Sequence, residues 1–383
     1  MTKGKYRYLV ISELFLPTKG GTAVWFDEVY RRIGGREIHI VTADVPGAAE
    51  YDNSHSNTIH RVSLNRHWWL RPESLAMYVK LFFKTFRVAL LHKIDAVHAG
   101  RVLPEGLVGL VVARLFRKPL VIYAHGEEIT TWRQSGKFKV MVFTYRHADI
   151  VIANSDFTRD ELLKIGVANE KIVLISPGVD VHRFKPGLQV DDLYTSIGIN
   201  NNQKLILSVG RLSRRKGFDM VIQAIHELLA RGLDIHYALI GIGEDQAYLE
   251  SLIEEKGLED RVHFLGHVDA DDLPRWYNAC DFFVMPNREI DGDTEGFGMV
   301  FLEAAACGKT VIAGQAGGTG AAVNDGETGL RVDGTNLDSV VNALEYLLTD
   351  DESVKTMQVN GLHRAVNEFA WERVAEKTRQ LHT

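Results

Sequence analysis

The sequence predicts an α/β protein built from two Rossmann-like, doubly wound domains that face a cleft. The length of 383 residues exceeds one ordinary hydrophobic core and suits two domains of about 190 residues each. Short apolar runs rich in β-branched residues alternate with amphipathic segments, as in parallel sheets that are buried on both faces. This alternation starts again near Leu188, which indicates a second complete domain.

The first domain is expected to span residues 1–187. Its apolar runs lie between helical patterns, and this alternation favours parallel strands joined by helices. Strands are expected within residues 6–12, 37–43, 95–100, 119–125 and 148–155, and helices within 23–33 and 107–116.

The second domain is expected to span residues 188–365, with its own set of strands. These are expected within 204–212, 236–245, 261–268, 281–287, 309–315 and 329–334, with a helix over 218–232. A long helical pattern, 353–382, is expected to be interrupted at Gly361, and its end, about 366–383, to pack back on the first domain. Open α/β sheets bind ligands beyond the carboxyl ends of their strands, so two such domains predict a ligand cleft.

Charge is divided unevenly along the chain, whose net charge is -6. Residues 1–187 carry 27 Lys and Arg against 18 Asp and Glu, whereas the remainder carries 17 against 32. A basic first half suits an anionic surface or substrate, although two solvated surfaces that merely differ remain an alternative.

Cysteine usage and the start of the chain bear on the compartment. Cys280 and Cys307 each lie in an apolar run and are expected to be small core residues rather than a disulfide. The first residues lead directly into a strand-like run, so neither a signal peptide nor a spanning helix is expected there. A cytoplasmic location is therefore expected.

Glycines and cations follow the first predicted strand of each domain. Gly20 and Gly21 open a helix and can bring backbone N–H groups close to a phosphate, although such a turn can also be purely structural. Arg211 ends a strand and Lys216 precedes the next helix, so both can approach one pyrophosphate. A solvated basic loop is the alternative, to which Arg214 and Arg215 are assigned.

A histidine and two glutamates complete the candidate site. His125 ends an apolar strand, so its ring can reach the mouth of the predicted cleft. Glu295 and Glu303 flank a Gly-Phe-Gly turn in "EGFGMVFLE". A helix that begins near Gly298 would offer its first free N–H groups to a phosphate between those carboxylates. This arrangement suits an elongated ligand such as a nucleotide sugar.

Several motifs together resemble a known family. "KGGTA", "AHGEE", "SPGVDVHRF", "GRLSRRKG", "EGFGMVFLEAAACG" and "FAWERVA" occur in the order seen in the retaining glycosyltransferases of family four, which have the GT-B fold. The resemblance covers nearly the whole chain. It is strongest to GDP-mannose-dependent phosphatidylinositol mannosyltransferases, although relatives that use UDP-sugars share the same motifs.

The resemblance implies a role for each motif residue. His125, Arg211, Lys216 and Glu295 would be catalytic, with His125 beside the anomeric centre and the two cations on the diphosphate. Glu295 would contact the donor sugar and Glu303 the ribose hydroxyls. The amides of Phe297, Gly298, Met299 and Val300 would contact the sugar and phosphate, and the loop at Gly20 and Gly21 would close over phosphate and acceptor.

The resemblance also implies how retention arises and which molecules take part. No second acidic residue is evident on the acceptor side, so front-face substitution is expected rather than a glycosidase-like carboxylate pair. The co-substrate would be a GDP- or UDP-linked sugar, with no other cofactor, and the acceptor a lipid-linked or glycan hydroxyl; no nucleic-acid partner is expected. No metal is expected at "DGD", Asp291–Asp293, because Arg211 and Lys216 would already neutralise the diphosphate. The histidines and cysteines also lack metal-site spacing.

One segment suggests peripheral contact with an anionic membrane. Residues 65–93 mix aromatic and basic side chains, namely Trp68, Trp69, Phe82, Phe83 and Phe86 with Arg66, Arg71, Lys80, Lys84 and Arg87. Such a surface can lie on anionic lipid. The alternative is an amphipathic helix whose aromatic side chains fill the core.

Other functions remain open on sequence alone. Within the family, a UDP-sugar-dependent enzyme with a soluble acceptor is the main alternative. A phosphorylase would need its own cofactor lysine, and an epimerase of this fold would lack the paired glutamates. A noncatalytic protein that binds sugar nucleotides is the alternative from another class.

Overall fold

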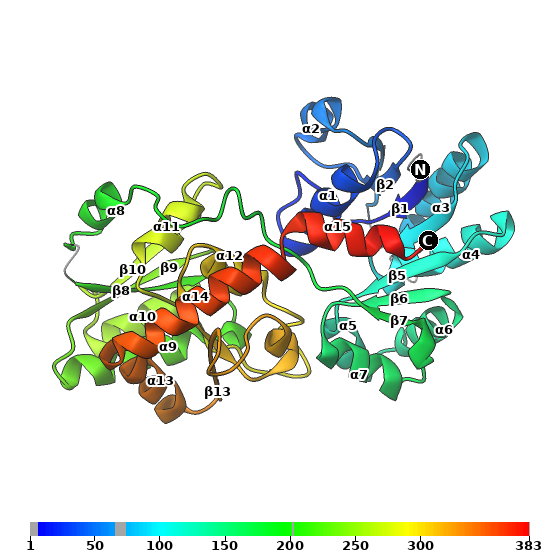
Figure 1. Ribbon diagram of the computed structural model, residues 1–383. Coiled ribbons are helices and arrows are strands. Elements are labelled where there is room, and N and C mark those ends of the chain that lie inside the picture. Colours follow the sequence, from blue (N-terminus) through cyan, green and yellow to red (C-terminus); the bar gives the residue numbers. More distant parts are fainter. Residues whose placement is uncertain (1–6, 66–73, 201–202, 383) are drawn as a thin grey trace. The chain divides into compact units, whose positions relative to one another are not determined.

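The protein consists of two compact units in a computed structural model (Figure 1), which describes residues 7–65, 74–200 and 203–382. Unit 1 comprises Met1–Pro177 and Trp371–Thr383, and unit 2 comprises Gly178–Ala370. The division therefore falls ten residues before the predicted boundary at 187. The cause is the segment after Pro177, in which Val179 N–H donates to the Phe369 carbonyl and Phe184 joins the second core.

Unit 1 contains a parallel sheet of seven strands in the order β3-β2-β1-β4-β5-β6-β7. Nearly all side chains of the central strands are buried, which explains their unbroken apolar sequences. The strands are β1 (Tyr8–Ile11), β2 (His39–Ala43), β3 (Thr58–Val62), β4 (Ala96–Ala99), β5 (Leu120–Ala124), β6 (Ile150–Ala153) and β7 (Ile172–Leu174).

Helices connect the strands of unit 1 and supply the other half of its core. Ser155 begins one of them by accepting a hydrogen bond from the Thr158 N–H. The helices are α1 (Gly21–Ile33), α2 (Ala48–Ser54), α3 (Leu75–Leu91), α4 (Leu107–Phe116), α5 (Glu127–Thr131), α6 (Phe138–His147) and α7 (Asp156–Lys164), with a π-helical turn at Val102–Gly106 and a 3-10 turn at Asn169–Lys171.

The last helix, α15 (Trp371–Gln380), belongs to unit 1 and packs against α1 (Figure 1). Trp371, Val374 and Ala375 are buried, and Arg32 Nε donates to Glu372 at 2.9 Å. The return to unit 1 thus begins at residue 371, not near 366 as the sequence predicts.

Unit 2 contains a parallel sheet of six strands in the order β10-β9-β8-β11-β12-β13. The strands are β8 (Lys204–Val209), β9 (Ile235–Ile240), β10 (Val262–Gly266), β11 (Phe282–Met285), β12 (Thr310–Gly314) and β13 (Gly329–Val332). The helices are α8 (Asp191–Ser196), α9 (Phe218–Ala230), α10 (Gln246–Lys256), α11 (Leu273–Ala279), α12 (Met299–Ala306), α13 (Leu337–Thr349) and α14 (Asp351–Glu368), with 3-10 turns at Arg214–Lys216 and Gly317–Ala321.

Helix α14 runs without a break through Gly361, contrary to the predicted interruption there. A Cβ at this position would lie 3.6 Å from the Cβ of Ala305 and 3.4 Å from the Thr328 carbonyl oxygen. Both are ordinary van der Waals distances, so a larger residue would also fit here. The packing of α14 against α12 outweighs the lower helix propensity of glycine.

Each sheet has one point where its strand order reverses. In unit 1 the reversal lies between β1 and β4, and in unit 2 it lies between β8 and β11. Loops that leave neighbouring strands at such a point diverge toward opposite faces of the sheet and leave room for a ligand at the carboxyl ends. The predicted site residues follow these strands or their neighbours.

Candidate active site

A cluster of charges lies at the switch point of unit 2. Lys216 ends the 3-10 turn between β8 and α9, and Glu295 lies in the loop between β11 and α12. Lys216 Nζ donates to Glu295 Oε2 at 2.5 Å, and Arg215 Nη1 donates to the same oxygen at 2.9 Å. The Lys216 and Glu295 side chains are 11% and 14% exposed. The structure therefore joins two of the predicted site residues directly.

Burial and the two cations act in opposite directions on Glu295. Burial raises the pKa of its carboxyl group, but the charges and hydrogen bonds of Lys216 and Arg215 outweigh burial and leave that pKa below its usual value. Glu295 is therefore an anion at neutral pH. The Glu295 carboxylate can accept hydrogen bonds from sugar hydroxyls. The two cations beside it, Lys216 and Arg215, can pair with a diphosphate.

The second predicted cation, Arg211, is not part of this cluster. The Arg211 side chain is 73% exposed, and its Nε donates to Glu244 at 2.9 Å. Arg215, which the sequence analysis assigned to a solvated loop, instead contacts both Glu295 and Asp293. The sequence offered no signal to choose among consecutive cations, since the tight turn at Arg214–Lys216 decides which side chains point to the cluster.

A buried ion pair fixes the two loops of this cluster to each other. Arg288 follows β11, and its Nη2 donates to both carboxylate oxygens of Asp219 in the first turn of α9, at 2.9 and 2.7 Å. Their side chains are 11% and 8% exposed. The Arg288 N–H also donates to the Arg215 carbonyl at 2.8 Å. These contacts position Lys216 and Arg215 relative to the loop that carries Glu295.

The segment "DGD" forms a tight turn. Ile290 and Asp293 exchange two backbone hydrogen bonds, of 3.0 and 2.8 Å, across Asp291 and Gly292. Both central residues have positive φ, 52° and 81°, as an Asp-Gly hairpin turn requires. Asp293 then pairs with Arg215 at 3.2 Å. The turn thus accounts for Asp291, and the ion pair with Arg215 accounts for Asp293.

The helix that follows Glu295 begins where the sequence predicts. Gly298 precedes α12 with φ 88° and no side chain caps the helix, so the Met299 and Val300 amides stand in its first turn. A Cβ at Gly298 would also meet the Phe301 ring at 2.5 Å, which excludes other residues. The Phe297 side chain is buried in the core, so only its backbone can meet a ligand.

Glu303 lies one turn further along α12 and has a different environment. Tyr277 donates its hydroxyl to Glu303 Oε2 at 2.8 Å. Burial raises the pKa of Glu303, and the Tyr277 hydrogen bond offsets this only in part. The environments of the two glutamates thus differ. The negative charge of Glu295 is balanced by two cations, whereas Glu303 accepts a hydrogen bond from a neutral hydroxyl.

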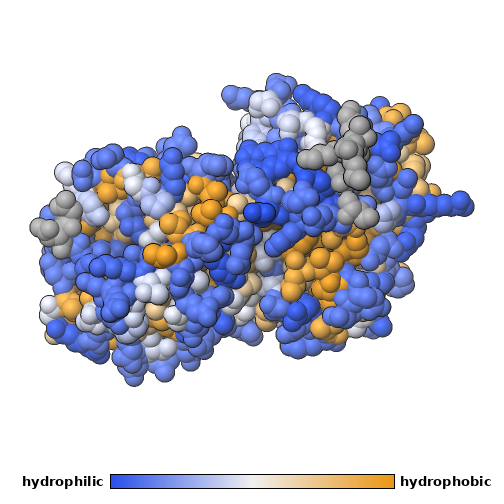
Figure 2. Space-filling view, viewed as in Figure 1, coloured by the Kyte–Doolittle hydropathy of each residue, from blue (hydrophilic) through white to orange (hydrophobic). Residues whose placement is uncertain are grey.

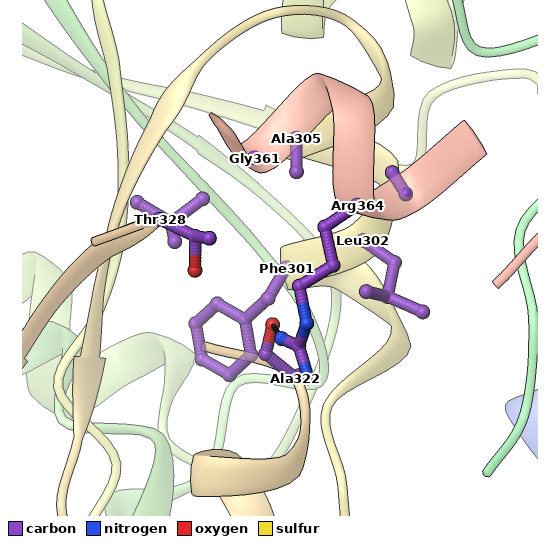
Figure 3. Close-up of a pocket in the computed structure, with 9 residues that line it drawn as sticks. Phe301, Leu302, Ala305, Ala322, Thr328, Gly361 and Arg364 are labelled. Atoms are coloured by element: carbon purple, nitrogen blue, oxygen red, sulfur yellow. Dashed lines mark hydrogen bonds between the residues drawn. The ribbon is translucent and has the colours of Figure 1, made fainter. Parts of the chain in front are cut away.

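A small pocket also lies between α12 and α14 (Figure 3), but it lacks the chemistry of a donor site. Its lining is mostly apolar, with Phe301, Leu302 and Ala305 on α12. Arg364 reaches into it from α14, where its guanidinium donates to the Ala321 and Ala322 carbonyls at 2.9 Å. The Arg364 guanidinium therefore caps the end of the 3-10 turn at Gly317–Ala321.

In unit 1, Gly20 and Gly21 lie where the sequence predicts. Gly20 precedes α1 with φ 138°, a conformation that L residues rarely adopt, and a Cβ there would meet nothing within 4 Å. No side chain caps α1. The backbone at this helix start therefore has the freedom and the free N–H groups that a close approach to an anion requires.

His125 follows β5 and is held by backbone atoms. Its Nε2 lies 2.9 Å from the Gly100 carbonyl oxygen, which can only accept, so this nitrogen carries a proton. Burial lowers the pKa of the ring, which is therefore neutral at pH 7. The Trp25 ring packs edge-on against it at 5.8 Å. A neutral ring with its Nε2 proton committed can offer a ligand only the Nδ1 lone pair.

Comparison with known proteins places these features in a family. Residues 19–183 match glycosyltransferase family 4, and residues 190–364 match glycosyl transferases group 1. The GDP-mannose-dependent alpha-(1-6)-phosphatidylinositol monomannoside mannosyltransferase of Mycolicibacterium smegmatis is 30% identical over 368 residues, 95% of this chain and 94% of that protein. The D-inositol 3-phosphate glycosyltransferase of Corynebacterium diphtheriae is 34% identical over 245 residues, 62% and 56% of the two chains.

Solved structures agree on the fold. Anabaena Alr3699/HepE in complex with UDP and glucose has a TM-score of 0.82 at 22% identity, over 98% of this chain and 99% of that chain. Sucrose-phosphate synthase from Thermosynechococcus elongatus has a TM-score of 0.82 at 23% identity, over 99% and 98%. The fold is therefore GT-B, as the sequence predicts. The chain belongs to glycosyltransferase family 4 and is a glycosyltransferase.

Proposed function

We propose that this enzyme transfers a mannosyl group from GDP-mannose to a hydroxyl group of a lipid-linked or glycan acceptor, with retention at the anomeric carbon. The observation that carries the proposal is the Glu295–Lys216–Arg215 cluster at the switch point of unit 2. It places an anion for sugar hydroxyls beside cations for a diphosphate. The choice of GDP-mannose is supported by the relative that is 30% identical over nearly the whole chain.

In the proposed reaction, unit 2 binds the donor. Lys216, together with Arg211 after it leaves Glu244, offsets the charge that grows on the diphosphate, and the first amides of α12 assist. The bond between the anomeric carbon and the phosphate oxygen breaks, and the acceptor oxygen attacks from the same face. The proton of the acceptor hydroxyl passes to the departing phosphate oxygen. The neutral His125 ring would orient the sugar through Nδ1, and no metal ion is required.

The direct test is transfer of radiolabelled mannose from GDP-mannose to a phosphatidylinositol monomannoside. We expect a labelled lipid with an α-linkage, and activity that persists in excess EDTA. UDP-glucose serves as the matched donor, and free inositol phosphate as the soluble acceptor. Faster transfer from UDP-glucose would overturn the donor assignment. Abolition by EDTA with rescue by Mn²⁺ would overturn the metal-independent mechanism.

We also propose that α3 and α4 place the enzyme on an anionic membrane. The contact proposed is peripheral. No described helix, within 7–65, 74–200 and 203–382, is long and apolar enough to cross a bilayer. Phe83, Leu90 and Leu91 of α3 are 64%, 65% and 63% exposed, and Leu115 of α4 is exposed as well. Apolar residues gather over α3 in Figure 2. Lys80 and Arg87 on α3 are exposed beside them.

The structure divides the aromatic residues of this segment between two roles. Phe82 packs against the core of unit 1, and Phe86 contacts the Phe116 ring at 5.5 Å. Phe83 alone among these three phenylalanines faces outward. Trp68, Trp69, Arg66 and Arg71 lie outside the described residues. The membrane proposal therefore depends on Phe83 and aliphatic side chains more than on an aromatic surface.

Vesicle sedimentation tests this proposal. Each exposed cation near an anionic surface contributes about 1 kcal/mol, and salt screens that attraction. We expect binding to anionic vesicles at low salt, release at high salt, and weak binding after Lys80, Lys84 and Arg87 are replaced by Gln. Replacing Lys139, Lys164 and Lys171 by Gln removes the same charge elsewhere in unit 1. Equal binding by both variants, or none by the wild type, would contradict the proposal.

A further inference from the structure

Three histidines from separate elements meet in unit 1, away from the glycosyltransferase site. They are His39 at the start of β2, His60 in β3 and His92 directly after α3. One ring nitrogen of each lies within 4.8 Å of those of the other two. His39 Nδ1 and His60 Nε2 are 3.1 Å apart, and the His39 and His92 rings stack at 4.0 Å.

The fold brings them together for a simple reason. His39 pairs with Thr58 and Val41 with His60, so His39 and His60 project from the same face of the sheet on adjacent strands. Helix α3 packs on this part of the sheet and ends at Leu91, which brings His92 to the His39 ring. The cluster lies near the beginning of β2, whereas Gly20 and His125 follow the ends of β1 and β5.

We propose that His39, His60 and His92 bind one divalent transition-metal ion, with Zn²⁺ the preferred ion. Imidazole nitrogens are suitable ligands for Zn²⁺, Cu²⁺ and Ni²⁺. Nitrogens bound to one tetrahedral Zn²⁺ at about 2.0–2.1 Å are about 3.3 Å apart, close to the observed His39–His60 separation. His92 is exposed and can move the remaining distance, and water would fill the fourth position.

The separation between His39 Nδ1 and His60 Nε2 is that of a hydrogen bond, so one of these two nitrogens carries a proton. A metal ion bound to both nitrogens would displace this proton or shift it to the other nitrogen of the same ring. The charge of Lys84 acts on His60, so this side chain would have to turn away from a bound metal ion.

Unit 2 contains a comparable histidine pair, and no third ligand joins it among the residues that the structure describes. His236 on β9 and His263 on β10 stack at 5.3 Å, with His236 Nδ1 and His263 Nε2 3.0 Å apart. The other nitrogen, His236 Nε2, is contacted by Arg261 Nη1 at 3.2 Å and by Gln203 Nε2 at 3.1 Å. A guanidinium at this point repels a metal ion. The pair therefore supplies a control within the same chain.

The site would stabilise unit 1 rather than take part in transfer. It would tie β2, β3 and the end of α3 together, and metal affinity would add to the free energy of folding. This role is independent of the proposed catalytic function. A chelated enzyme should melt at a lower temperature yet transfer sugar at an unchanged rate when assayed well below that temperature.

The experiment uses the full chain without an affinity tag, stripped with EDTA and dialysed. Zn²⁺ is titrated by calorimetry, Co²⁺ is followed by its visible absorption bands, and melting is recorded with and without Zn²⁺. We expect one ion per chain and a melting temperature about 5 °C higher at 100 times the dissociation constant. His92→Ala, at an exposed position, and His60→Gln should each weaken Zn²⁺ binding at least about tenfold.

His263→Gln is the matched variant and should bind Zn²⁺ as the wild type does. The melting temperatures of the metal-free proteins show whether each variant is folded. Absence of stoichiometric binding by the wild type would overturn the proposal. So would equal binding by the wild type and His92→Ala, or loss of binding in His263→Gln alone.

Discussion

The two units share one topology, but their switch points carry different chemistry. In unit 2 the loops after β8 and β11 bring Lys216, Arg215 and Glu295 into one charged cluster. In unit 1 the loop after β1 leads to Gly20, and the carbonyl of Gly100, directly after β4, holds the neutral His125 ring. The fold thus fixes where a ligand can bind, and the side chains at each switch point decide which chemical group of the ligand binds there.

The proposed function divides the two substrates along this difference. A diphosphate carries charge that paired cations can offset, so it belongs with unit 2. In the proposed function the acceptor hydroxyl needs positioning more than charge, which suits the glycine turn and the neutral imidazole of unit 1. Substitutions in the two units test this division.

The largest expected effect is on stability. Arg288→Met leaves the buried Asp219 carboxylate without its partner, which should destabilise unit 2 by about 3–5 kcal/mol. A calorimetric scan should show this as a lower melting temperature. The double variant Arg288→Met with Asp219→Leu removes both charges and should recover most of the loss. If the melting temperature of the double variant did not recover, the ion pair would be needed for the geometry of the two loops.

Lys216→Ala should have the largest effect on turnover in a protein that still folds. A cation aimed at the departing diphosphate stabilises the transition state more than the bound donor, so kcat should fall by about 10²-fold or more. Arg211→Ala should act in the same direction if Arg211 leaves Glu244 on donor binding. Lys204→Ala, at an exposed lysine of β8, is the matched control. Unchanged turnover in Lys216→Ala would refute its role.

A smaller effect is expected for Glu303→Ala. A ribose contact is made equally in the ground and transition states, so the KM for the donor should rise, by about tenfold, with little change in kcat. Glu303→Gln separates hydrogen bonding from charge. Steady-state kinetics against donor gives the result. A large fall in kcat at constant KM would move Glu303 from the ribose to the reacting sugar.

The smallest effect concerns acid stability. The pKa of Glu295 is lower in the folded protein than in the unfolded chain, so its ion pairs stabilise unit 2 above the unfolded pKa. That stabilisation is lost as the pH falls through the folded pKa. Melting curves of the wild type and Glu295→Gln should therefore converge in acid and diverge toward neutral pH. A constant difference across this range would contradict the pKa direction.

Much of the fold could be predicted because its signals are local. Apolar runs, glycine turns and the restart of the pattern predict both sheets, and the helix at Met299 begins where expected. The structure divides the chain ten residues before the predicted boundary at 187, because Val179 and Phe184 are held by contacts with distant residues of unit 2. The break at Gly361 was wrong because helix packing outweighs the lower helix propensity of glycine.

The candidate site was predictable in part. The pairing of Lys216 with Glu295 is consistent with the motifs, whereas Arg215 and Arg288 depend on loop geometry that no local pattern encodes. The histidine cluster was missed for the same reason. His39, His60 and His92 have no metal-site spacing and meet only because adjacent strands and the end of α3 converge.

The most direct test of the contrast between the units is GDP binding. GDP carries the ribose and diphosphate but no sugar, so its affinity should depend on unit 2 alone. Calorimetric titration of GDP should show binding by the wild type, binding weakened about tenfold in Glu303→Ala, and unchanged binding in His125→Ala. Weakened binding in His125→Ala with full affinity in Glu303→Ala would contradict the assignment of the donor to unit 2.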